Sequence, residues 1–322
     1  MLSVIIPSRS PQFLRQTVES LLGNAEGEVE VIVVFDGIWP PDSEMPPEDD
    51  RVVMVHHGEV HNHKGMRASI NQGMRLAKGE YVMVIDEQCS VDKGYDVKLA
   101  ADCEDNWVVV PRRQRLAPDS WKLTTEVEGD RRPPVDYMIL DYPYQRPYDK
   151  TCGLHGAEDR QTAKDRSDVL IDDLMTMQGS CYFMKRSYWE ELFPNGLDDV
   201  NYGTFTQEAQ EVSNTAWLSG GAVKVNKKTW YAHWHKGKGG KGYGFSREQY
   251  KRHCEGMERG RLYCIDYWVH RNADNKYPRD FAWLIEKFNP PGWPKNWQEQ
   301  IKIDRERDFS ATYKEKGYDP KW

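Results

Sequence analysis

The order of apolar runs in the first 112 residues constrains the fold most strongly. Residues 2–6 form a β-branched run that predicts a buried strand, and 13–23 have apolar residues at helical spacing. A second strand run follows at 28–37. A strand, a helix and a strand in that order predict a βαβ unit, in which the two strands lie parallel in one sheet.

The same alternation continues along the chain. Strand patterns recur at 52–57, 81–86 and 107–112, with a helical pattern at 64–78. Later segments predict a strand and a helix over 180–192, a helix over 208–221 and a strand over 222–235. We therefore expect an α/β fold with a mainly parallel, twisted sheet flanked by helices.

The domain organisation follows from where this alternation stops. Residues 113–178 are polar, Pro-rich and weakly periodic, and predict long loops with short elements. Residues 246–322 are mainly helical in pattern. We expect a catalytic domain over 1–245, with 113–178 as an insert or acceptor region, and a helical C-terminal extension over 246–322.

Net charge and composition argue against some classes of protein. The net charge of -7 argues against a molecule that clamps DNA over its whole surface, although 224–261 is locally basic. The six cysteines are scattered without a CxxC pair, which indicates reduced thiols. The N-terminal segment lacks the basic flank of a signal peptide, and no apolar run approaches the roughly 20 residues of a membrane helix. We expect a cytoplasmic protein with no membrane segment.

Polar groups follow the predicted strands at their carboxyl ends, where open α/β sheets bind ligands. These groups are Pro7-Ser8-Arg9, Asp36-Gly37, Gly65-Met66-Arg67 and Asp86-Glu87-Gln88. A single group of this kind is usually a helix cap or a turn. Their arrival at consecutive strand ends predicts a ligand site.

The residues in these positions resemble known motifs. Residues 65–73, 77–81 and 84–86 are similar to the G-x-x-x-A-x-N-x-G, A-x-G-E-Y and L-D segments of the family 2 glycosyltransferases. Residues 178–184 resemble the glycine loop of the polypeptide N-acetylgalactosaminyltransferases, and 208–221 resemble their E-N-x-E-L-S, W and G-G helix. The resemblance implies a GT-A fold and a nucleotide-diphosphate sugar donor, with UDP-sugar expected.

The resemblance also implies a metal site. Asp86 occupies the first position of the family's DxD motif, whereas Gln88 stands where the family has Asp or His, and Glu87 is at the variable position. His233 and His235 lie on one face of the last predicted strand, where a family ligand is expected. One nitrogen ligand beside carboxylate oxygens favours Mn²⁺ over Mg²⁺. Which of the two histidines binds is left open.

Donor and catalytic residues are expected around this metal. The resemblance implies that Ser8 and Asp36 contact the nucleoside, while Arg67 and the lysines of 236–241 are candidates for the phosphates. The complete set of expected donor-binding residues is Pro7, Ser8, Arg9, Asp36, Gly65, Arg67, Asp86, Gly179, Ser180 and Lys236.

The catalytic candidates are Glu208, Asp199 and Glu211. Inverting relatives usually place an Asp base directly after the first of these, where this chain has Ala209. Either Glu208, Asp198 or Asp199 supplies the base, or the configuration of the sugar is retained and no base is needed.

The expected reaction is transfer of a sugar to a hydroxyl on a protein, a glycan or a modified DNA base. The DNA alternative depends on the basic segment 224–261 and its interleaved aromatic residues. Two other classes stay open: a nucleotidyltransferase that makes sugar nucleotides, although residues 8–11 lack its glycine-rich loop, and a catalytically inactive carbohydrate-binding or nucleotide-binding relative.

Overall fold

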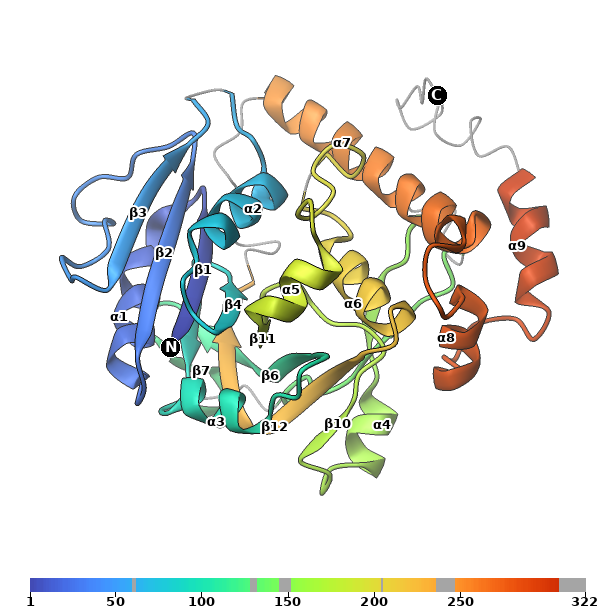
Figure 1. Ribbon diagram of the computed structural model, residues 1–322, viewed down its shortest axis with the longest axis horizontal. Coiled ribbons are helices and arrows are strands. Elements are labelled where there is room, and N and C mark those ends of the chain that lie inside the picture. The colour runs from blue at the N-terminus through green and yellow to red at the C-terminus, as the bar shows by residue number, and fades with distance from the viewer. Residues whose placement is uncertain (60–61, 128–131, 145–151, 204, 236–246, 307–322) are drawn as a thin grey trace.

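A large mixed sheet forms the centre of the computed structural model, which describes residues 1–59, 62–127, 132–144, 152–203, 205–235 and 247–306 (Figure 1). In the described part of the chain the strand order is β10-β12-β6-β11-β4-β1-β2-β3, with β5 beside β12 and β7 beside β6. The strands are β1 (Leu2–Ser8), β2 (Val29–Asp36), β3 (Val52–His57), β4 (Tyr81–Ile85), β5 (Cys89–Val91), β6 (Trp107–Ala117), β7 (Lys122–Leu123), β10 (Ile171–Asp173), β11 (Cys181–Lys185) and β12 (Ala222–His233).

The N-terminal half of the sheet is parallel. Strand β1 pairs in parallel with β2 and β4, and β2 pairs in parallel with β3. All residues of β2 are buried, as its continuous apolar run predicts for a strand covered on both faces. The helices α1 (Leu14–Asn24) and α2 (Met66–Leu76) make the crossovers, so the predicted βαβ units are confirmed.

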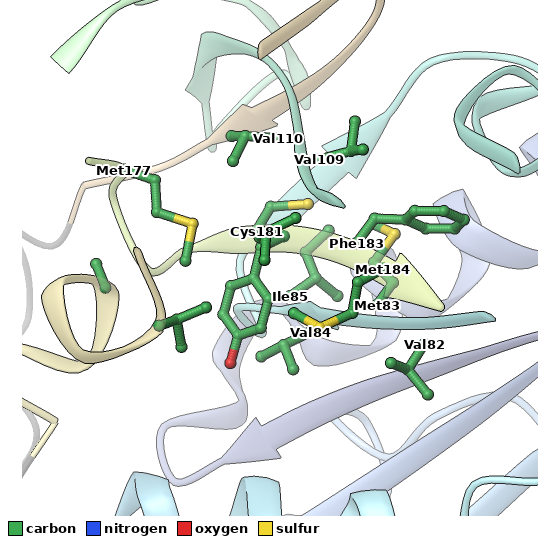
Figure 2. Close-up of a cluster of buried hydrophobic side chains, with 14 of the residues drawn as sticks. Val82, Met83, Val84, Ile85, Val109, Val110, Met177, Cys181, Phe183 and Met184 are labelled. Atoms are coloured by element: carbon green, nitrogen blue, oxygen red, sulfur yellow. The ribbon is translucent and has the colours of Figure 1, made fainter. Parts of the chain in front are cut away.

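The C-terminal half of the sheet is mixed. Strand β11 lies antiparallel between β4 and β6, and β12 runs parallel to β6. Figure 2 shows the apolar packing at this junction, where Val84 and Ile85 of β4 lie with Val109 of β6 and Phe183 of β11. The buried ladder holds the end of β4 rigidly, directly before Asp86.

Helices cover the sheet and extend beyond it. The remaining helices are α3 (Tyr95–Asp102), α4 (Arg160–Asp165), α5 (Arg186–Leu192), α6 (Glu208–Leu218), α7 (Arg247–Ile265), α8 (Phe281–Phe288) and α9 (Trp297–Glu306). In Figure 1 the orange and red helices α7, α8 and α9 lie together at one side of the molecule. They confirm the predicted helical C-terminal part.

The C-terminal helices share the core of the rest of the chain. Trp268, Phe281 and Leu284 are buried in the same apolar cluster as the strands. The ring of Trp217 on α6 lies 5.3 Å from that of Phe288 on α8. A division into domains at residue 245 stays a prediction.

The predicted insert contains a small hairpin. Strands β8 (Met138–Leu140) and β9 (Gly156–Glu158) pair antiparallel apart from the main sheet. The short elements β5 and α3 were not predicted from the sequence. All six cysteines are free thiols, and within the described residues no helix is long and apolar enough to cross a membrane.

Candidate active site

A cleft of about 950 Å³ opens at the carboxyl ends of β1, β2 and β4. It brings together predicted residues from distant parts of the sequence. The predicted residues that line it are Pro7, Ser8, Arg9, Asp36, Gly65, Asp86, Gln88, Gly179, Ser180, Glu208, His233 and His235. Both the carboxyl edge of the parallel sheet and the loop before α6 therefore face one cavity.

Glu87 holds the segment that follows β1. Its buried carboxylate accepts hydrogen bonds from the Ser8 hydroxyl at 2.5 Å and from the backbone N–H of Ser10 at 2.8 Å. The backbone N–H of Arg9 donates to the same carboxylate at 3.1 Å. The hydroxyl of Ser8 is thus committed to Glu87, which gives this variable motif position a structural role that sequence reasoning missed.

Asp36 organises the start of α2. Its carboxylate accepts hydrogen bonds from the backbone N–H groups of Lys64 at 2.7 Å and Gly65 at 2.9 Å. Gly65 has φ 94°, a conformation that favours glycine because it has no Cβ. The contact brings the end of β2 and the helix start to the same side of the cleft.

Three side chains that could hold a metal converge at the ends of β4 and β12. Strand β5 pairs with β12 so that His233 lies opposite Cys89, next to Gln88. His233 Nε2 is 3.2 Å from Asp86 Oδ2 and 3.0 Å from the Gln88 side-chain nitrogen. That nitrogen is 3.5 Å from Asp86 Oδ2.

This donor set fits a hard divalent ion. Adjacent ligand atoms around a six-coordinate ion with bonds of about 2.1 Å are about 3 Å apart, close to the observed separations. The buried Gln88 Oε1 has no hydrogen-bond partner, and exchanging the amide O and N would turn an oxygen toward Asp86 and His233. The described residues contain no group of three His, Cys, Asp or Glu side chains suited to a metal, so Gln88 is needed to complete the set.

His233, the last residue of β12, and His235, two residues further on, have different surroundings. His235 Nε2 accepts a hydrogen bond from the Arg113 guanidinium at 2.8 Å. Burial, with the neighbouring His233 and Arg113, lowers the pKa of His235 to about 3. Arg113 also donates to Gln178 and Glu158. These contacts commit His235 to the wall of the cleft and favour His233 as the ligand.

Glu208 is a buried carboxylate at the first position of α6. Burial raises its pKa to about 8, while Tyr182 and Arg67 oppose this shift. Gly179 lies so close that a Cβ there would collide with Glu208 Oε2. The glycine loop therefore leaves space for the carboxylate, and Oε1 has no hydrogen-bond partner in the described structure.

Arg67 and Glu211 do not line the cleft. Their side chains form a buried ion pair between α2 and α6, and Arg67 also donates to the Thr206 carbonyl at 2.9 Å. The Arg67 guanidinium lies over the Tyr202 ring at 4.1 Å. The pair thus supports the loop before Glu208, whereas the sequence prediction placed Arg67 on phosphate and Glu211 at the reacting centre.

Other predicted residues lie elsewhere. Asp199 is exposed outside the cleft, and the Asp198 carboxylate accepts backbone N–H groups of its own turn. Lys236 and the other lysines of 236–241, the predicted phosphate candidates, lie outside the described residues. Lys224 and Lys228 of the basic segment are paired with Asp173 and Asp102.

Comparison with known proteins defines the class. The fold is similar to the crystal structure of GalNAc-T7 with UDP, GalNAc and Mn²⁺, at a TM-score of 0.56 and 16% identity over 95% of this chain and 57% of that chain. The fold is therefore that of the GT-A glycosyltransferases.

The family follows from the sequence match. Residues 3–193 match the model of glycosyl transferase family 2, more than half of the chain, so the chain belongs to this family of transferase enzymes. It is also 24% identical over 111 residues to the uncharacterized glycosyltransferase EpsJ of Bacillus subtilis (strain 168). That match spans 33% of this chain and 31% of EpsJ.

Proposed function

We propose that the protein is a metal-dependent glycosyltransferase that moves a sugar from a UDP-sugar donor to an acceptor hydroxyl. The observation that carries this proposal is the convergence of Asp86, Gln88 and His233 in the cleft that also contains Glu208. The family and the fold agree with it, and the GalNAc-T7 structure was solved with UDP and Mn²⁺.

Asp86, Gln88 and His233 would hold the metal, with Mn²⁺ favoured by the mixed nitrogen and oxygen set. When bound, the ion supplies charge neutralisation for the diphosphate leaving group. Asp36 keeps the backbone of Lys64 and Gly65 in place at the donor end of the cleft. Glu87 does the same for residues 8–10.

Glu208 is the proposed proton acceptor. In the transfer, the bond between the anomeric carbon and the diphosphate oxygen breaks and its electron pair leaves with UDP. A new bond forms from the acceptor oxygen to the anomeric carbon, and the hydroxyl proton moves to Glu208. Among Glu208, Asp198 and Asp199, only Glu208 lines the cleft, and its raised pKa makes its ionised carboxylate a stronger base than an ordinary surface acid.

UDP release from a panel of UDP-sugars, with and without Mn²⁺, tests this function. We expect Mn²⁺-dependent release that rises when an acceptor is added. Glu208→Gln should lower turnover with acceptor by about 10²- to 10⁴-fold and leave UDP affinity within about threefold. Release that is independent of metal, or unchanged in Glu208→Gln, would contradict the proposal.

A further inference from the structure

The part of helix α7 that lines the cleft is rich in basic side chains. The helix carries both acids and bases, yet the charged or titratable side chains of α7 that line the cleft are Arg252, His253, Arg259 and Arg261. The acids Glu248, Glu255 and Glu258 are not in this lining; Glu248 and Glu255 are exposed, and Glu258 is partly buried. A net charge of -7 makes the local excess of arginine an exception to the charge of the whole molecule.

Arg252 and Arg259 have weak or no acidic partners among the described residues. Arg252 has an exposed ion pair with Glu248 at 3.9 Å, which contributes little. Arg259 has no ion pair with a described residue, and its guanidinium lies against Gly203 at the cleft. Burial lowers the pKa of His253, and the positive charges of Arg9 and Arg261 lower it further. His253 therefore has arginines near it both on α7 and in the segment after β1.

The spacing suits more than one anionic group. Arg252 and Arg259 are seven residues apart on one helix, or about 10 Å along its axis. A lone phosphate cannot span that distance, whereas successive phosphates of a strand can. The donor diphosphate is already accounted for by the metal ligands at the ends of β4 and β12.

An aromatic surface lies beside the arginines. Phe205 is 42% exposed, and its ring stacks on His253 with the centroids 5.6 Å apart. Both rings line the cleft. An exposed ring next to arginines is the combination with which proteins bind single-stranded nucleic acid.

The cleft is also large for a site that takes one small ligand. Its volume of about 950 Å³ is near the upper limit for a site that encloses one small ligand, about 1,000 Å³. A nucleotide-sugar at the sheet end leaves space toward α7 for the part of an acceptor that carries the hydroxyl.

We propose that the acceptor is a single-stranded or locally unpaired nucleic acid, whose phosphates bind Arg252 and Arg259 and one of whose bases stacks on Phe205. This inference rests on the proposed function, because it assigns the acceptor of that same transfer. The three residues lie on α7 and on the loop before α6, which places the strand beside Glu208 at the start of α6.

Binding of a fluorescein-labelled single-stranded DNA of about 12 nucleotides, followed by anisotropy, tests the proposal. The titrations use the full chain with UDP and Mn²⁺, between about 50 and 200 mM NaCl. We expect Arg252→Glu/Arg259→Glu to weaken binding at least about tenfold and to reduce the salt slope by about 1.4. Phe205→Ala should weaken binding without changing the salt slope.

Lys251→Glu is the matched control, since Lys251 is exposed on the same helix and lies outside the cleft lining. It should change affinity less than about threefold. Equal losses in Lys251→Glu and the arginine variant would overturn the proposal, because only diffuse charge would then matter. Binding to vesicles of anionic phospholipid but not to the oligonucleotide would also overturn it.

Calorimetric binding of UDP with Mn²⁺ to the same proteins separates the two proposals. We expect every variant to keep UDP affinity within about threefold of wild type. Wild type that binds UDP but not the oligonucleotide would overturn the acceptor assignment alone. Loss of UDP binding in the arginine variant would assign these arginines to the donor and overturn it as well. Failure of wild type to bind UDP would instead contradict the proposed function.

Discussion

At the residue scale, Glu208 has an environment unlike that of an ordinary surface acid. Its side chain is almost fully buried, and burial raises its pKa from 4.5 to about 8. The carboxyl group is therefore protonated near neutral pH in the folded protein without substrates. In the unfolded chain the same group is ionised above about pH 4.5.

Because the pKa of Glu208 differs between the folded and unfolded chain, the free energy of unfolding depends on pH. Between about pH 4.5 and pH 8 the folded protein keeps a proton on Glu208 that the unfolded chain has lost, so folding becomes less favourable as pH rises. Glu208→Gln removes this dependence. We expect the melting temperature of the variant, relative to wild type, to rise by at least about 3 °C from pH 5 to pH 8.

Thermal unfolding of the metal-free proteins at both pH values measures this change, with Glu190→Gln on the exposed face of α5 as a control that should show none. A temperature difference between wild type and Glu208→Gln that stays constant with pH would contradict the raised pKa.

At the element scale, α2 connects the donor end of the cleft to the loop that presents Glu208. Its first turn is held by Asp36, and Arg67 binds Glu211 and the Thr206 carbonyl. One turn further along, the Asn71 side chain donates to the Leu197 carbonyl and accepts from the Leu197 N–H. A helix near the N-terminus thereby positions a segment more than a hundred residues away.

Breaking the Arg67–Glu211 pair should destabilise the fold strongly. Arg67→Met leaves Glu211 as a buried carboxylate without its cation, and we expect a loss of about 3–5 kcal/mol in the free energy of unfolding. Urea denaturation measures it. Arg75→Met is the control, because Arg75 is exposed on the same helix and donates a hydrogen bond to the nearby Gln72. A loss under about 1 kcal/mol in Arg67→Met would show that the pair holds nothing in place.

The glycine loop should tolerate no side chain at Gly179. A Cβ at this position would push Glu208 away, so Gly179→Ala should lower acceptor-dependent UDP release by at least about 10²-fold and keep UDP affinity within about tenfold. Gly23→Ala is the control, because the space around that glycine is open. Full activity of Gly179→Ala would mean that the carboxylate can move without consequence.

The sequence predicted the elements that have strong local signals. The apolar runs of β1, β2 and β4 and the periodicity of α1, α2 and α6 located those elements to within a few residues. Strand β5 has only three residues, and its place is decided by pairing with β12 far along the chain. Such pairing leaves no periodic pattern that a single sequence could reveal.

The site was partly predictable, because some of its residues are marked by local position and others depend on distant partners. Strand ends mark where ligands bind, so Asp36, Asp86 and Ser8 could be proposed from position alone. The direction in which each side chain points could not be predicted from position. Arg67 at the start of α2 and Glu87 after β4 stand where binding residues are expected. In the structure Arg67 forms a buried ion pair, and Glu87 holds the loop after β1. The partners that decide this are 79 and 144 residues distant in the sequence.

At the scale of the whole molecule, the cleft combines parts that local patterns treat separately. The parallel sheet contributes one wall, the hairpin β8–β9 contributes Met138 and Glu158, and α7 contributes its arginines. Trp293 in the C-terminal region donates to the Leu140 carbonyl of the hairpin at 2.8 Å. The insert and the C-terminal helices thus depend on one another around the cleft.

The central claim is that Asp86, Gln88 and His233 hold a divalent metal that binds the donor diphosphate. Calorimetric titration of UDP into wild type and Asp86→Ala, each with and without Mn²⁺, tests it most directly. We predict that wild type binds UDP with Mn²⁺ at least about 100-fold more tightly than without it, and that Asp86→Ala abolishes this difference. Equal UDP affinity with and without Mn²⁺ in wild type would contradict the account.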